Sequence, residues 1–251
     1  TNPVADVCEA AGIPCLTTIS PWQAWYFGRG AKPGDRFRWS FHFFFGLEDI
    51  IASYLSLWQP LEVKGAVGVL WPDDDDGHAF ANPDTGFPPA LKEAGYAIVD
   101  PGRFSLQGEV NYAAMVSQFK SSNVEIVTGA LPPPFFIEFW KECLRQQFKP
   151  KAVTVAKAVE FPEALMPFKR DASGITSLVW WSPKHPWKSG MTGQSAHQLA
   201  HTYMQASQRN WTMPLGIKHA LFEIVLDVLR RSGGPGRPDA LREALATTSY
   251  D

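Results

Sequence analysis

A run of acidic residues is the feature of this sequence that most suggests a ligand. Residues 73–77 read Asp-Asp-Asp-Asp-Gly, a composition typical of calcium loops. With Gly77 at the sixth position of an EF-hand loop, Pro72 and Pro83 would occupy the first and twelfth positions, where carboxylates are required. The run therefore does not form an EF-hand. It follows an apolar segment that predicts a buried strand, so it is either part of a ligand site at a sheet edge or a solvated turn.

Histidine and serine residues near position 195 suggest metal binding or catalysis. His197 and His201 have the i, i+4 spacing at which two imidazoles share a metal, but the HExxH glutamate and a third ligand are missing. Ser195 lies in a Gly-x-Ser-x-His stretch, one residue different from the nucleophile elbow, and no strand directly precedes it. We therefore favour a surface or packing role for the two histidines, and a helix N-terminus for the stretch around Ser195. With no G-x-G-x-x-G and no P-loop either, we predict no catalytic residue, metal or cofactor.

Indole-rich segments are the third candidate for a functional site. The chain has 10 Trp and 17 Phe, a Trp content well above ordinary usage. Residues 21–29 and 180–187 each follow a predicted strand and are expected to be loops. Their indoles either stack on a bound organic molecule, with Thr17, Thr18 and Ser20 as polar partners, or fill an interface between two lobes.

Composition limits the class of protein that holds these residues. The 251 residues are 45% hydrophobic and 19% charged, with a net charge of −2, which excludes a disordered chain and a basic nucleic-acid surface. The three cysteines, Cys8, Cys15 and Cys143, are too few for a disulfide framework, although one bridge stays open. The strongest apolar window, residues 37–58, contains charged residues and is too polar to span a bilayer.

Strands and helices alternate through the middle of the chain, which predicts an α/β fold with a parallel sheet covered by helices on both faces. Strands are expected over 64–71, 96–100, 124–130, 151–157 and 174–181, and helices over 46–58, 88–95, 108–121, 133–147 and 161–169.

The flanks predict a helix over 2–11, strands over 13–18 and 36–43, and helices over 193–207, 215–231 and 238–246. Because two strands cannot by themselves make a covered parallel sheet, both flanks are assigned to a second lobe.

The order of these elements resembles the type I periplasmic binding proteins of the branched-chain amino acid (Leu/Ile/Val-binding) ABC-transporter family. Residues 3–21, PVADVCEAAGIPCLTTISP, are similar to that family's helix, Gly-Ile/Val-Pro, strand and Ser/Thr stretch. Residues 64–81, KGAVGVLWPDDDDGHAFA, resemble its strand, turn and glycine-containing helix start. Residues 91–130 are similar to its central core, with Asn111-Tyr112 in place of Asp-Phe. Residues 214–233 resemble its Gly-Tyr-Asp-Ala helix.

This resemblance implies two doubly wound parallel-sheet lobes with a cleft that closes on a small solute. Lobe 1 would take residues 1–42 plus 184–251 and be incomplete, with a further part upstream of Thr1 and a shorter tail after Asp251. Lobe 2 would take residues 43–183. The implied function is the periplasmic solute-binding component of an ABC importer, without catalytic activity and with a signal peptide in its precursor. Its partners would be a small-molecule solute and the membrane permease subunits.

The resemblance also implies where the solute binds. The expected contacts are Thr17, Thr18, Ser20, Trp22, Asp76, Gly77, His78, Leu131, Pro132, Lys157 and Glu160, and the indole-rich segment adds Trp181. Asp76 and Ile217 stand where the family has tyrosine. An amino-acid-like solute or an aromatic acid or amide is therefore expected rather than a branched-chain amino acid.

Two alternatives stay open at this stage. A regulatory sensor domain of the same fold would share these features, and a hydrolase would use Ser195 or the pair of histidines. A truncated lobe would also expose apolar surface and a sheet edge, from which we expect the chain to self-associate.

Overall fold

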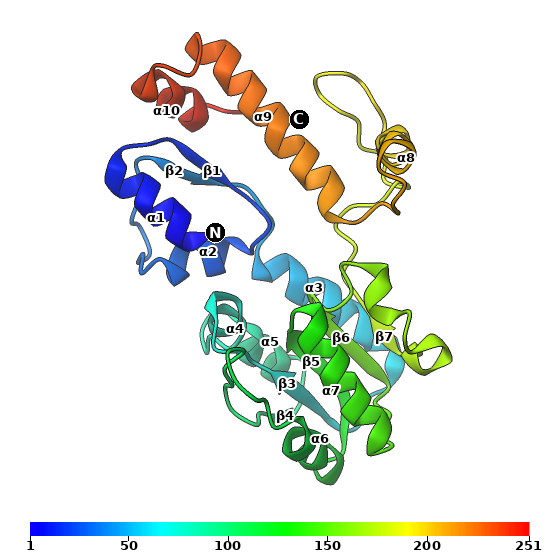
Figure 1. Cartoon of the computed structure of the whole chain (residues 1–251). Helices are drawn as coiled ribbons and strands as arrows, with labels where there is room; N and C mark the ends of the chain where they lie inside the picture. Colours follow the sequence, from blue (N-terminus) through cyan, green and yellow to red (C-terminus); the bar gives the residue numbers. More distant parts are fainter. Residues whose placement is uncertain (251) are drawn as a thin grey trace. The chain divides into compact units, whose positions relative to one another are not determined.

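The chain folds into two compact units. The computed structural model describes residues 1–250 (Figure 1). Unit 1 comprises Thr1–Phe44 and Val179–Asp251, and unit 2 comprises Phe45–Leu178. The sequence alone predicts these boundaries after His42 and Pro183.

Unit 2 is built on a five-stranded parallel sheet in the order β4-β3-β5-β6-β7. The strands are β3 (Ala66–Leu70), β4 (Ile98–Val99), β5 (Val124–Ala130), β6 (Ala152–Ala156) and β7 (Ile175–Thr176). All five predicted strands are present. The strand expected over 174–181 is wrong in length, because β7 is an edge strand that pairs only with β6 and only at Ile175 and Thr176.

The helices of unit 2 follow the predicted alternation. They are α3 (Leu47–Trp58), α4 (Asp75–Phe80), α5 (Phe87–Glu93), α6 (Tyr112–Ser121) and α7 (Pro133–Arg145), with 3-10 turns at Gln59–Leu61, Pro162–Leu165 and Lys169–Ala172. The helix expected over 161–169 is therefore wrong: two short 3-10 turns replace it. Helix α6 begins at Tyr112 rather than 108, because the Asn111 side chain accepts a hydrogen bond from the amide of Ala114 at 3.0 Å and caps the helix there.

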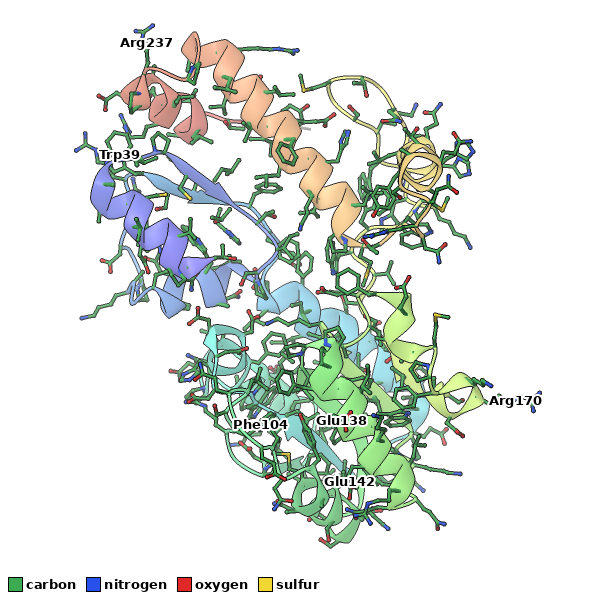
Figure 2. The ribbon with its side chains drawn as sticks, in the orientation of Figure 1. Trp39, Phe104, Glu138, Glu142, Arg170 and Arg237 are labelled. Carbon is green, nitrogen blue, oxygen red and sulfur yellow. The ribbon has the colours of Figure 1, made fainter. Side chains whose placement is uncertain are left out.

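The amphipathic character of α7 shows how this sequence builds the core. Figure 2 labels Glu138 and Glu142, which form ion pairs one turn further on with Lys141 at 2.8 Å and Arg145 at 2.6 Å. The buried residues of the same helix lie on its other face, at the spacing of an amphipathic helix; they are Phe136, Phe139, Trp140 and Cys143. Opposing polar and apolar faces hold α7 against the sheet.

Unit 1 contains a two-stranded parallel sheet of β1 (Cys15–Thr17) and β2 (Ser40–His42), paired from Cys15 with Ser40 to Thr17 with His42. Its helices are α1 (Asn2–Ala11), α2 (Trp22–Gly28), α8 (Ala196–Ser207), α9 (Pro214–Ser232) and α10 (Pro238–Ala246). Helix α1 ends as predicted, with Gly12 in the left-handed region at φ 67°.

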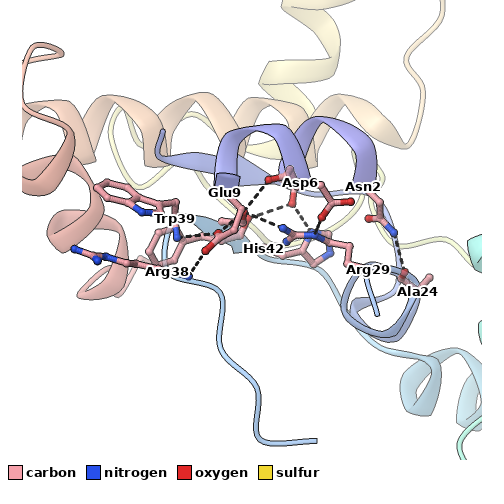
Figure 3. Close-up of polar contacts among 12 residues, drawn as sticks. Asn2, Asp6, Glu9, Ala24, Arg29, Arg38, Trp39 and His42 are labelled. Carbon is pink, nitrogen blue, oxygen red and sulfur yellow. Dashed lines mark hydrogen bonds and ion pairs between the residues drawn. The ribbon is translucent and has the colours of Figure 1, made fainter. Parts of the chain in front are cut away.

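The loop expected over 21–29 is wrong, because these residues form helix α2. Tertiary contacts fix the helix: the side-chain amide of Asn2 donates to the carbonyl of Ala24 at 3.1 Å, and the Arg29 guanidinium pairs with Asp6 at 2.6 Å (Figure 3). The same guanidinium lies 3.7 Å from the centre of the Phe37 ring. Polar contacts therefore hold the helix against α1, while Trp25 packs on Phe37 of the following chain with ring centroids 5.1 Å apart.

Glu9 joins α1 to the segment that leads into β2. Its carboxylate accepts the backbone amides of Arg38 at 2.7 Å and Trp39 at 2.9 Å (Figure 3). Burial alone would raise the pKa of Glu9, but these amides and the Ser40 hydroxyl stabilise the carboxylate and lower its pKa.

No helix among the described residues is long and apolar enough to cross a membrane.

Candidate functional site

The acidic run lies at the carboxyl end of β3 and starts helix α4. Asp74 is the N-cap, and its carboxylate accepts a hydrogen bond from the amide of Gly77 at 2.8 Å. Asp75 and Asp76 occupy the first turn, where negative charge is stabilised by the helix dipole. The run is thus a folded helix start at a strand end, the place where open α/β sheets bind ligands.

Lys157 brings the end of β6 to this acidic run. Its ammonium forms an ion pair with Asp76 and lies 3.9 Å from the carboxylate of Asp74. Burial alone would lower the pKa of Lys157, but the carboxylates of Asp76, Asp74 and Glu160 outweigh it and raise the pKa. The structure therefore brings three of the expected solute contacts, Asp76, Lys157 and Glu160, into one electrostatic cluster, and it adds Asp74. We call these four residues the carboxylate–lysine cluster.

Tyr54 is a residue of this region that the sequence analysis missed. It lies on α3, is 2% exposed, and its hydroxyl has no hydrogen-bond partner among the described residues. Burial raises the pKa of this phenol, and the charge of Glu160 raises it further. A buried hydroxyl without a partner costs free energy, so a polar group of a ligand would stabilise it.

The neighbouring expected contacts have different surroundings. The imidazole of His78 lies 2.7 Å from a carboxylate oxygen of Asp73 and 3.3 Å from the guanidinium of Arg103. Leu131 is fully buried, so only its backbone is available, and its amide already donates to Ala156 at 3.0 Å. Pro132 is the N-cap of α7. Leu131 and Pro132 therefore hold the turn after β5.

A second polar cluster lies at the carboxyl ends of β1 and β2 in unit 1. The Nε2 of His42 is 2.8 Å from the carbonyl oxygen of Ser20, so this nitrogen carries a proton and donates it. Burial lowers the pKa of His42 although the Ser20 contact raises it. The Thr17 hydroxyl, which lies 2.9 Å from Nδ1 of this ring and 3.1 Å from the carbonyl oxygen of Phe41, can donate its one proton to either acceptor. We call Thr17, Ser20, Trp25 and His42 the histidine cluster.

Aromatic stacking fixes the histidine cluster. The Trp25 ring is stacked on His42 with centroids 5.0 Å apart and an angle of 13° between the planes. Thr18 donates to the carbonyl of Phe43 at 2.7 Å. Trp22, at the first turn of α2, is 38% exposed and contacts Tyr26 and Phe27. The sequence predicts Thr17, Thr18, Ser20 and Trp22 here, and Trp25 among the indoles of residues 21–29, but gives no signal for His42.

Backbone strain marks both clusters. Ile19, two residues after β1, has φ 63°, and Lys157, directly after β6, has φ 67°. Left-handed backbone is unfavourable for residues other than glycine, and especially for a β-branched one such as Ile19. Such strain tends to occur at functional sites.

Trp181 has a different environment. It is 6% exposed and packs with Ala196 and Ala200 of α8, with its ring perpendicular to that of Trp211. Gly216 leaves room for its indole, since a Cβ at that position would overlap the ring. Trp181 is thus a core residue of unit 1 that also lines a cavity described below.

The catalytic and metal motifs near residue 195 have structural roles. Ser195 caps α8, its hydroxyl oxygen accepting the amide of Gln198 at 3.2 Å, while the Gln198 side chain accepts the amide of Ser195 at 2.9 Å. His197 and His201 lie on the exposed face of α8. No group of three or more potential His, Cys, Asp or Glu ligands occurs among residues 1–250. Ser195 is therefore a helix cap, and the two histidines are surface residues.

Both units are α/β structures with polar clusters at the carboxyl ends of parallel strands, the place where proteins built on open α/β sheets bind ligands. The comparisons with known proteins agree. A periplasmic binding protein family model matches residues 1–251, and the chain therefore belongs to the periplasmic binding protein family. The predicted resemblance and α/β fold class are confirmed. No curated protein matches this sequence.

Solved structures show the type I fold of this family. The chain is similar to a leucine-binding protein from Thermotoga maritima, with a TM-score of 0.78 and 15% identity over 96% of this chain and 64% of that one. It is also similar to a type 1 periplasmic binding protein from Bordetella pertussis, with a TM-score of 0.73 and 14% identity over 98% of this chain and 66% of that one. A fatty acid ABC transporter substrate-binding protein from Thermomonospora curvata gives a TM-score of 0.70 and 12% identity, over 98% and 67% of the two chains. The chain thus spans about two thirds of the length of these proteins.

Proposed function

We propose that this protein is the extracytoplasmic solute-binding component of an ABC importer, and that it delivers its solute to membrane permease subunits. The family and the similar structures, which include a leucine-binding and a fatty acid-binding transport protein, support this role. The carboxylate–lysine cluster is the observation on which the proposal chiefly depends. Its charged groups converge at two strand ends, beside the unpartnered hydroxyl of Tyr54.

The chemistry of the two clusters favours an amino-acid-like solute or an aromatic acid or amide. Three carboxylates surround the single ammonium of Lys157, so the region can accept hydrogen bonds from a solute's amine or amide and donate from Lys157 to a carboxylate. Near the histidine cluster, Trp22 offers an exposed indole surface, on which an aromatic ring can stack. We propose as solute contacts the expected residues other than the core residues Leu131 and Trp181, together with Asp74 and Tyr54.

A thermal-shift and calorimetry screen of amino acids, aromatic acids and small amides tests this proposal. A solute that binds only the folded protein stabilises it by about 2.7 kcal/mol at about one hundred times its dissociation constant. Asp76→Asn should weaken binding by about tenfold or more, because it removes a charge next to Lys157. Glu138→Gln, on the solvent side of α7, is the matched control and should leave binding unchanged. The absence of any binding, or equal effects of the two variants, would refute the proposed site.

We also propose that this chain self-associates through unit 1. Large apolar side chains are exposed on two of its helices, including Val4 and Val7 on α1 and Phe222 and Leu226 on α9. Apolar groups at i, i+3 or i, i+4 on one helix form a continuous strip that tends to be buried by association. Light scattering should give a mass above that of the monomer, and Phe222→Glu should lower it. A monomer at all concentrations would contradict this expectation.

A further inference from the structure

A separate cavity lies within unit 1, among α8, α9 and residues 180–189. Its volume is about 210 Å³. Three indoles line it, those of Trp180, Trp181 and Trp187. An engineered cavity of about 150 Å³ is large enough to bind benzene, so this one accommodates a small organic molecule. Apart from Trp181, none of its lining residues is among the expected solute contacts.

The cavity wall also contains a buried carboxylate, that of Glu223 on α9. Glu223 is 7% exposed. Its Oε1 accepts a hydrogen bond from the hydroxyl of Ser189 and lies 3.6 Å from Nδ1 of His219, and its Oε2 is 3.4 Å from the hydroxyl of Tyr250. Ser189 is itself held by the backbone amide of Thr192 at 2.9 Å. These contacts fix the position of the carboxylate.

The charge of Glu223 has no strong counter-ion in the described part of the chain. No lysine or arginine there forms an ion pair with it, and His219 is a cation only when protonated. Lys188 also lines the cavity, but it is exposed and its backbone is held in a bridge to Ser195. Because a buried charge is costly unless it is paired, a bound cation would stabilise Glu223.

The indoles provide the complementary surface for such a cation. The ring of Trp181 is fixed, packed on Gly216 and against Trp211 with centroids 5.9 Å apart. Trp187 is 63% exposed, so its ring is available to an occupant. An indole face is the aromatic surface that binds organic cations best. Indole walls beside a fixed carboxylate form a recognition site for ammonium groups.

We propose that this cavity binds a small organic cation, a primary or N-methylated amine with a few carbon atoms, whose ammonium group lies between Glu223 and the indoles. The carboxylate disfavours anions, and the volume excludes peptides. The site goes beyond the proposed solute site and does not depend on it.

Calorimetric titration with choline tests this site. The reference ligand is the uncharged isostere of choline, in which a tert-butyl group replaces trimethylammonium. Choline should bind at least tenfold more tightly than this isostere, because only choline has the charge. Glu223→Gln should weaken choline binding by tenfold or more, whereas Glu243→Gln, an exposed glutamate on α10, should leave it unchanged.

A second variant keeps the test decisive if Glu223→Gln fails to fold. Trp187→Ala removes an exposed side chain, so it should fold normally and still weaken choline binding severalfold, while Leu57→Ala, which removes a 41% exposed apolar side chain of α3 outside both proposed sites, should not. Equal binding of choline and its isostere would overturn the proposal. So would equal effects of the two glutamate variants, or no binding of choline to the folded protein at about 10 mM. Failure of the solute screen would leave this result unaffected, which separates the two proposals.

Discussion

Replacing Gly77 by alanine should destabilise the protein strongly, because there is no room for a methyl group at this position. Gly77 lies in the first turn of α4, and a Cβ built on it would overlap the carbonyl oxygen of Pro72, well inside the 3.0 Å that real Cβ atoms keep. The backbone of Gly77 is not in the left-handed region, so only the lack of space opposes a methyl group there.

The size of the loss in unfolding free energy depends on how easily the Pro72 carbonyl can move away from the added methyl group. Pro72 forms a bridge with Phe104, and the next amide, of Asp73, donates to the Phe104 carbonyl at 2.8 Å, so the obstructing oxygen is anchored. Overpacking of this kind costs about 1–3 kcal/mol. A shift of the turn would also break the cap between Asp74 and the Gly77 amide, at about 1 kcal/mol. We therefore expect Gly77→Ala to lower the free energy of unfolding by about 3 kcal/mol.

Urea denaturation followed by tryptophan fluorescence measures this difference. The matched control is Gly108→Ala, also in unit 2, where nothing lies within 4 Å of the added Cβ. The control should change the free energy of unfolding by less than about 1 kcal/mol. If both variants were equally stable, the close approach between α4 and the end of β3 would be refuted. The same variant should also weaken solute binding, because it displaces Asp74 and Asp76 relative to Lys157.

Three further predictions concern buried polar groups. Thr154→Val removes the acceptor of the buried Trp58 indole N–H, 2.9 Å away, and should cost about 1–3 kcal/mol in urea denaturation; if Trp58→Phe cost the same free energy in the wild-type and in the Thr154→Val background, the hydrogen bond would not be the cause. The pKa of His42 is lowered below 6.5, so the unfolded chain binds more protons and stability should fall as pH drops below about 6.5; denaturation at about pH 7.5 and 5.5 should show this loss, and His42→Gln should reduce it. Burial raises the pKa of Cys15 to about 11, so iodoacetamide should label it more slowly in the folded than in the urea-unfolded protein at about pH 8, and equal rates would contradict this burial.

The sheet of unit 2 was predictable because its signals are local. Strand β5 has its predicted bounds, and α7 begins at the predicted residue, since a largely apolar run and a Pro-initiated amphipathic pattern each need no knowledge of distant residues. Helix α2 was not predictable. Its sequence, Trp-Gln-Ala-Trp-Tyr-Phe-Gly, is aromatic and short, and the contacts from Asn2 and Asp6 that stabilise it come from α1.

The candidate site was predictable only in part, for the same reason. Asp76 and Lys157 were expected from strand ends and from the family resemblance, but their ion pair joins residues far apart in the sequence. Tyr54 and His42 carried no signal, because a tyrosine inside an amphipathic helix and a histidine ending a strand are ordinary in sequence. Their roles depend on burial and on partners such as Ser20, which only the folded chain provides.

The two ligand sites proposed for this protein differ in the charged groups that they offer to a ligand. In the carboxylate–lysine cluster three carboxylates face one ammonium, whereas in the indole cavity Glu223 has no lysine or arginine ion-pair partner in the described part of the chain. Lys157 lets the first site accept a carboxylate as well as an amine, whereas in the second the buried carboxylate of Glu223 repels a ligand's carboxylate and Lys188 is exposed. A zwitterionic amino acid should therefore prefer the first site, and a simple amine the second. Titrating one amine and its α-carboxylated analogue into Glu223→Gln and Asp76→Asn should show opposite sensitivities; if both ligands responded to the same variant, the two sites would not differ as described.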